Sequence, residues 1–230
     1  MDVPNKTPLF WTLAQIATIW LISDVAFYIV LPAWGIRSSY NAEPVYIALY
    51  YLFWIIVTFI ALRPTFKNWR PLEGNTQTYV TLLIFAAAIV YFVAYVLPQF
   101  PPIEWTESWK PPSELLFAES WYFLPKSLEI LLQQLLVAAL VLSFNTNGFS
   151  LRATSIWCAV LFGGIHILLI FGGSPAWYVA RFGISAFLAG AVFPYLLIRT
   201  KNGFAYAYML HWLYYAGTVV LIHTVSPYAG

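Results

Sequence analysis

The sequence predicts an all-α membrane protein, a polytopic transmembrane helix bundle of about seven spans. Three observations predict it. Of the 230 residues, 61% are hydrophobic and only 9% charged, whereas a soluble domain carries about 25% charged residues. Seven apolar stretches reach the length of roughly 20 residues that a helix needs to cross the hydrocarbon core. Aromatic residues reach 20%, and Trp and Tyr favour membrane interfaces.

Turn and charge signals separate the expected spans. Examples are Arg63-Pro64 and Asn147-Gly148. The apolar run that begins at residue 9 is too long for the core of a signal peptide, so we interpret it as the first span. The predicted spans are residues 9–31, 44–62, 78–97, 121–144, 151–171, 176–198 and 204–224.

We expect the whole chain, 1–230, to form one integral membrane domain. Residues 1–98 would hold the first three spans and residues 121–230 a core of four helices. The segment between them, 99–120, contains two pairs of prolines, which argue against a continuous helix. Trp105 and Trp109 favour a connector that lies along the membrane surface.

The distribution of cations predicts an orientation. With seven spans, one side of the membrane receives more cationic loops than the other, and the more basic side is cytoplasmic. The N-terminus would then be cytoplasmic and the C-terminus on the opposite side of a plasma or inner membrane. The two sets are Lys6, Arg63, Lys67, Arg70, Arg152, Arg199 and Lys201 against Arg37, Lys110, Lys126 and Arg181.

The sequence also indicates which partners to expect and what role the cysteine has. We expect membrane lipid and a membrane-embedded peptide or partner transmembrane helix as partners. No basic cluster of the kind that follows phosphates is present, which excludes nucleic acid. The single cysteine, Cys158, lies in an apolar run and is interpreted as a buried, inert thiol.

Few ionisable residues fall inside the predicted spans, and each is a functional candidate because an unpaired charge in lipid costs several kcal/mol. Glu129 has Gln133 one turn later and Lys126 three residues earlier, so a simple ion pair is the alternative to a catalytic role. His166 and His211 could instead be hydrogen-bonded core residues. His223 is expected near the outer membrane surface, and neither it nor Asp24 has an assigned role. The set is Asp24, Glu129, His166, His211 and His223.

A carboxyl and two imidazoles on three helices suit hydrolysis. Glu129 and His166 could share a water, deprotonate it and direct it at an amide carbon, while His211 donates to the oxyanion. Zinc is a competing use of such a set, but HExxH is absent and we expect no metal. Another alternative is a haem or chlorin with His166 or His211 as axial ligand, since Gly163 leaves room for a flat ring.

Residues 124–217 resemble the CPBP family of intramembrane proteins, which includes CAAX prenyl proteases and bacteriocin-processing proteins. That family carries EExxxR on one helix, FxxxH on the next and HxxxN on a helix two spans later. The corresponding segments here are E-I-L-L-Q-Q at 129–134, F-G-G-I-H at 162–166 and H-W-L-Y-Y at 211–215. The second motif is intact, whereas Ile130, Gln134 and Tyr215 replace a glutamate, an arginine and an asparagine.

The resemblance implies a metal-independent glutamate/histidine endopeptidase that needs no cofactor. Its catalytic residues would be Glu129, His166 and His211. The replaced residues imply the alternative of a catalytically inactive scaffold or accessory subunit of a larger membrane complex. A His-ligated pigment or haem-binding subunit is the third hypothesis. Gln133, Gln134 and Tyr215 could supply hydrogen bonds in place of the missing residues, and Phe162 of the intact motif is a further supporting residue.

Overall fold

The computed structural model describes residues 8–36, 39–67, 69, 75–100, 115, 118–172 and 176–225. Across these residues the regular structure is helical and no strand occurs, which confirms the predicted all-α bundle. The connector predicted at 99–120, with Trp105 and Trp109, lies mostly outside the described residues.

The helices match the predicted spans closely, with small shifts at their ends. Before the connector come α1 (Leu9–Val25), the π-helical turn η1 (Ala26–Val30), α2 (Leu31–Ala33), α3 (Pro44–Ala61), α4 (Arg63–Lys67), α5 (Asn75–Tyr91), the π-helical turn η2 (Phe92–Val96) and η3 (Leu97–Gln99). After it come η5 (Ser120–Tyr122), α6 (Phe123–Thr146), α7 (Leu151–Ile165), η6 (His166–Gly172), α8 (Ala176–Arg199) and α9 (Gly203–Val225).

Among the described residues, 6 helices are long and apolar enough to cross a membrane, as an integral membrane protein requires. They begin with Leu9–Ala33 and end with Ala176–Arg199. The seventh predicted span forms as the 23-residue helix α9. Helix α9 is not one of these six, and its tyrosines and His211 add polar groups to an otherwise apolar helix.

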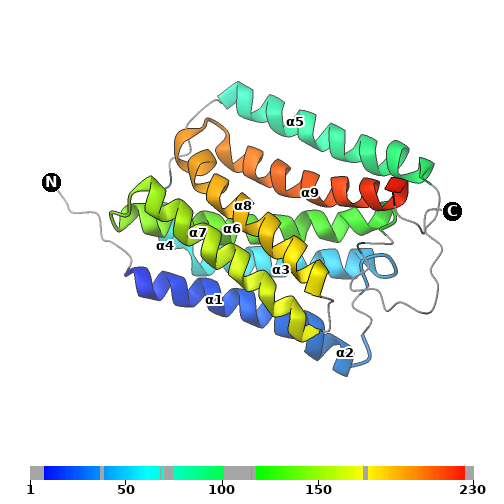
Figure 1. Ribbon diagram of the computed structural model, residues 1–230, viewed down its shortest axis with the longest axis horizontal. Coiled ribbons are helices and arrows are strands. Elements are labelled where there is room, and N and C mark those ends of the chain that lie inside the picture. The colour runs from blue at the N-terminus through cyan, green and yellow to red at the C-terminus, as the bar shows by residue number, and fades with distance from the viewer. Residues whose placement is uncertain are drawn as a thin grey trace.

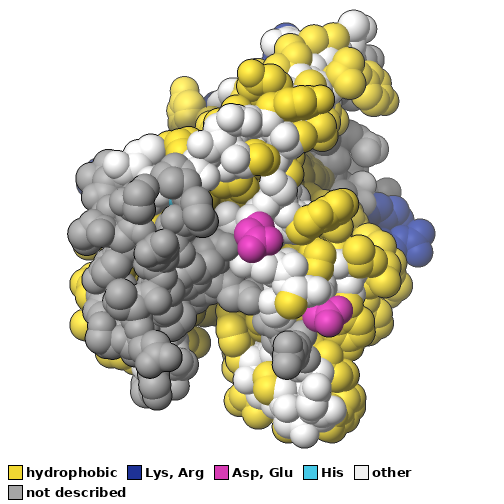
Figure 2. All heavy atoms as spheres, turned by 90° about the vertical axis from the view of Figure 1, so that its right-hand side faces the viewer, with side chains coloured by type: hydrophobic (Ala, Val, Ile, Leu, Met, Phe, Trp, Pro, Cys, Tyr) yellow, Lys and Arg dark blue, Asp and Glu magenta, His cyan; other side chains and the backbone are white. Residues whose placement is uncertain are grey.

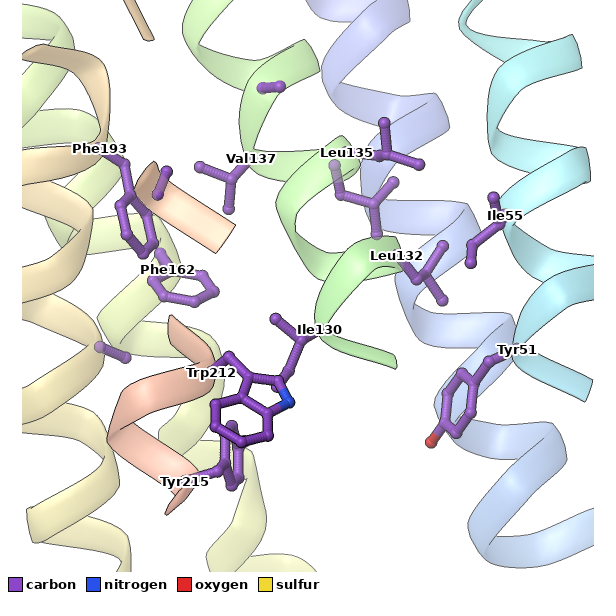
Figure 3. Packing of buried hydrophobic residues seen from close by; sticks show 14 of the residues in the cluster. Tyr51, Ile55, Ile130, Leu132, Leu135, Val137, Phe162, Phe193, Trp212 and Tyr215 are labelled. Carbon is purple, nitrogen blue, oxygen red and sulfur yellow. The ribbon is translucent and has the colours of Figure 1, made fainter. Parts of the chain in front are cut away.

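Helix α6 forms the centre of the bundle (Figure 1). In its most apolar window 78% of the residues are buried, against 6–33% in the other candidate spans. Figure 3 shows why: side chains leave α6 toward Tyr51 and Ile55 of α3 on one side and toward Trp212 and Phe162 on the other. Polar residues on α6 therefore meet protein instead of lipid.

Two glycines let α7 and α8 pack closely. A Cβ on Gly163 would lie 2.9 Å from Cβ of Phe187, and one on Gly190 would lie 2.8 Å from Cα of Ala159. Small residues at such crossings are a common means of helix packing in membranes. Helix α8 therefore fills the space beside Gly163. This close packing keeps His166, at the end of α7, near α8.

The two ends of the bundle differ in charge. The turns that carry the described cations Arg63, Lys67, Arg152, Arg199 and Lys201 lie at one end, where α7 begins and α8 turns into α9 (Figure 1). Figure 2 faces the other end, where acidic side chains stand apart among hydrophobic ones. Lys126, in the first turn of α6, lies toward this second end but is buried. The expected loop cations Lys6, Arg37, Arg70 and Lys110 lie outside the described residues.

Candidate functional site

Glu129 lies on the buried face of α6, and protein groups donate to both of its carboxylate oxygens. Oε2 accepts from Nζ of Lys126 at 2.5 Å and from the Tyr40 hydroxyl at 2.6 Å. Oε1 accepts from Nε2 of Gln133 at 3.0 Å. The i−3 and i+4 spacings bring Lys126 and Gln133 to Glu129 on one helix face. The carboxylate is thereby the counter-ion of Lys126.

Lys126 is a buried cation in an aromatic cage. Its Nζ lies 4.4 Å from the ring centre of Tyr215, 4.9 Å from that of Tyr40 and 5.7 Å from that of Tyr122. Cations held over aromatic faces gain about 2 kcal/mol or more when water is excluded. The tyrosine faces and Glu129 together compensate for the lost hydration of the ammonium group.

Tyr40 reaches Glu129 from the segment that precedes α3. Its hydroxyl donates to Glu129 and, 2.5 Å away, accepts from the hydroxyl of Tyr51. Burial, followed by the charge of Glu129, raises the pKa of Tyr40 well above its usual range, so the hydroxyl stays a donor. Phe27 of η1 packs against both tyrosine rings. This contact ties the first two spans to α6.

His166 ends α7 in a defined tautomer. Its Nδ1 lies 2.7 Å from the backbone oxygen of Phe162, one turn earlier. A carbonyl oxygen can only accept, so Nδ1 carries the proton. In the neutral ring Nε2 is then an acceptor.

His211 lies on α9 and is bound from α6. Its Nδ1 lies 3.0 Å from Nε2 of Gln134, a fully buried side chain. With the amide nitrogen placed toward the ring, Nδ1 accepts and Nε2 carries the proton. The Tyr215 ring stacks on His211 with centroids 5.6 Å apart and continues to the cage of Lys126.

A cavity of about 280 Å³ lies between α7, α8 and α9 and contains both histidines in its wall. Phe162, which packs against both imidazole rings, also lines it, as does Tyr215. Leu188, Val192 and Leu210 of its wall are exposed on the outside of the bundle. The cavity therefore opens between α8 and α9 toward the hydrocarbon region.

The second ring nitrogen of each histidine faces open space. Nε2 of His166 and Nε2 of His211 have no hydrogen-bond partner in the described part of the chain, and neither is an unpaired atom sealed inside the protein. Both residues line the cavity. The cavity wall thus offers one hydrogen-bond acceptor and one donor.

The predicted site residues fall into two neighbouring groups. His166, His211, Phe162 and Tyr215 line the cavity, and Gln134 holds His211 from behind. Glu129 and Gln133 belong to the Lys126 cluster and are not part of the cavity wall. No hydrogen bond joins Glu129 to His166 within the described residues.

Asp24 and His223 are the remaining candidates, and Asp24 lies near enough to Glu129 and Lys126 to interact with their charges. Asp24 lies near the end of α1 with Trp20, one turn earlier, as its hydrogen-bond partner. His223 lies in the last turn of α9, where its ring packs near Phe100. Neither residue lines the cavity.

Sequence reasoning missed the tyrosines. Tyr40, Tyr51 and Tyr122 complete the surroundings of the buried pair, although only their abundance was noted. Lys126 was weighed as a partner of Glu129 at a membrane interface, whereas the structure buries it within the bundle. A cation inside a span is the signal that could have drawn attention to nearby aromatic residues.

The geometry also bears on the two alternatives of a metal site and a haem site. Among the described residues, no group of three or more His, Cys, Asp and Glu side chains is placed to hold a metal ion. Nε2 of His166 has the chemistry of an axial haem ligand.

Comparisons with known proteins give no relative for this chain. No family model matches it, and neither the curated proteins nor the solved structures contain a match.

Proposed function

We propose that this chain is a CPBP-like membrane protein that binds a membrane-embedded molecule in the cavity between α7, α8 and α9 without cleaving it. One observation carries the proposal: Glu129 is the counter-ion of Lys126 and lies outside the cavity wall that holds both histidines. A Glu/His peptidase needs its carboxylate and imidazole around one water. The geometry supports binding over hydrolysis.

The replaced motif residues agree with this proposal. Ile130 is fully buried in the apolar core, where the resembled family has a second glutamate. Gln134 replaces the arginine and holds His211, and Tyr215 replaces the asparagine and stacks on the same ring. These contacts orient an imidazole in the cavity wall, which is what a binding site requires.

A second candidate function is the metal-independent endopeptidase. The opposite hydrogen-bonding character of the two exposed nitrogens favours it, because Nε2 of His166 can accept a proton from water while His211 donates to an oxyanion. Glu129 would then act only through the stacked residues between it and the cavity.

A cleavage assay separates the two functions. The protein is reconstituted in liposomes with a library of quenched-fluorescent transmembrane peptides, and wild type is compared with Glu129→Gln and His166→Phe. We expect the three proteins to give the same background signal. Cleavage by wild type that both variants lose would overturn the binding proposal and establish the peptidase.

The binding function has a test of its own. Ala189→Trp places an indole in the cavity wall, whereas Ile184→Trp places one on an exposed position of the same helix. Native mass spectrometry of protein released from nanodiscs should show a retained small molecule or peptide on wild type and Ile184→Trp but not on Ala189→Trp. Equal retention by both variants would contradict binding in this cavity.

We further infer that the basic end of the bundle faces the cytoplasm, with the N-terminus on that side and the C-terminus on the other. The described cations of the turns gather at that end, with Arg181 near the start of α8 at the other. With Lys126 in the first turn of α6, that other end has two described cations, Lys126 and Arg181, against five at the basic end.

A further inference from the structure

We propose that the cavity binds a neutral lipid that carries a hydroxyl group, with the hydroxyl between His166 and His211. This inference rests on the proposed binding function and names the chemical class of its ligand. It follows from the chemistry of the two exposed nitrogens, the charge of the cavity wall and the direction in which the cavity opens.

The two Nε2 atoms favour a ligand that can both donate and accept a hydrogen bond. Nδ1 of His166 is committed to the Phe162 carbonyl oxygen, which leaves Nε2 as an acceptor. Nδ1 of His211 accepts from Gln134, which leaves Nε2–H as a donor. A hydroxyl is the smallest neutral group that supplies both partners.

The cavity wall argues against a charged head group. None of the described residues that line the cavity is Asp, Glu, Lys or Arg. The nearby Lys126 is already paired with Glu129 and covered by Tyr215. Arg181 is the other nearby cation: its guanidinium lies over the rings of Phe182 and Tyr214 and donates to Thr218, and it is not part of the cavity wall. An anionic head between the histidines would be an unpaired charge, which at this depth costs several kcal/mol.

The opening indicates where the ligand comes from. Leu188 and Leu210 belong to the cavity wall, are 60% and 43% exposed, and lie on α8 and α9 respectively. A lipid in the bilayer can enter between these helices while its chain remains in the hydrocarbon. A volume of about 280 Å³ accommodates the polar end and the first part of a chain or ring.

The chain contains only three histidines, so imidazole nitrogen NMR can test the proposal directly. The full chain, labelled with ¹⁵N-histidine, is placed in phosphatidylcholine nanodiscs, and signals are assigned with single His→Phe variants. Before any ligand is added, we expect Nδ1–H with a free Nε2 for His166 and the opposite tautomer for His211.

The probes differ only in the head group: 1-dodecanol, dodecyl methyl ether, dodecanoic acid and dodecane. We expect dodecanol to shift Nε2 of His166 and His211 saturably and to leave His223 unchanged. The ether, which only accepts, should bind about fivefold more weakly because one hydrogen bond is lost. Dodecane should give no saturable shift. An aryl alcohol tested in parallel tells whether the natural hydroxyl is carried by a ring or by a chain.

Two variants of α8 control for non-specific partitioning. Ala189→Trp should abolish the shifts, and Ile184→Trp should retain them. The proposal is overturned if dodecane or the acid shifts the histidines as strongly as the alcohol. Saturable binding of another class that Ala189→Trp abolishes would leave the proposed function intact, whereas peptide cleavage would remove both. Should Ala189→Trp fail to fold, the probe series on wild type still decides.

Discussion

The ammonium group of Lys126 lies 2.5 Å from a carboxylate oxygen of Glu129, on the helix that the rest of the bundle surrounds. A buried pair of this kind is costly to break, because removal of one partner leaves the other charge uncompensated. Glu129 thereby stabilises the fold as the counter-ion of Lys126, and this role is independent of any chemistry in the cavity.

Replacement of Lys126 alone should destabilise the protein strongly. We expect Lys126→Met to lower the free energy of unfolding by about 3 kcal/mol, since it leaves the buried Glu129 carboxylate without its counter-ion. Unfolding by titration with denaturing detergent measures the change. The double variant Lys126→Met, Glu129→Gln should recover much of the loss. Additive losses in the double variant would show that the pair is not coupled.

Two adjacent glycines should respond differently to the same substitution. Gly163→Ala forces a Cβ to within 2.9 Å of Phe187 and should cost about 1–3 kcal/mol through overpacking. Gly164→Ala meets nothing within 4 Å and should be neutral, or stabilising by up to about 1 kcal/mol through helix propensity. Thermal unfolding in one detergent compares them, and equal effects would argue against the close contact between α7 and α8.

Gln134 should control the tautomer of His211. Gln134→Leu removes the partner of Nδ1, so the ¹⁵N spectrum should show His211 exchanging between both neutral tautomers. Gln133→Leu is the matched control, because Gln133 contacts Glu129 and not a histidine. If Gln134→Leu leaves the His211 signals as in wild type, the assigned hydrogen bond is wrong.

Accessibility of single cysteines should reveal the orientation. Cys158 is fully buried and can be replaced by alanine to give a cysteine-free background. In intact cells an impermeant maleimide should label Ala42→Cys, at the less basic end. Asn145→Cys, at the end with most cations, should react only after permeabilisation. The reverse labelling pattern would invert the proposed topology.

The sequence by itself determined the helical bundle and the contacts within single helices. Lipid offers no partners for backbone groups, so long apolar runs must become helices, and their lengths fix the spans. The spacing of Lys126, Glu129 and Gln133 placed them on one face of α6 before any packing was known. The intact FxxxH spacing likewise placed Phe162 one turn before His166.

Only the tertiary structure decided which of these groups meet across helices. Tyr40 is 89 residues from Glu129, and Gln134 is 77 residues from His211. Such contacts depend on the rotation of each helix about its axis, which an almost uniformly apolar sequence specifies weakly because lipid and core favour the same residues. Packing at Gly163 and around α6 set those rotations: they turn Glu129 toward Tyr40 and both histidines toward the cavity.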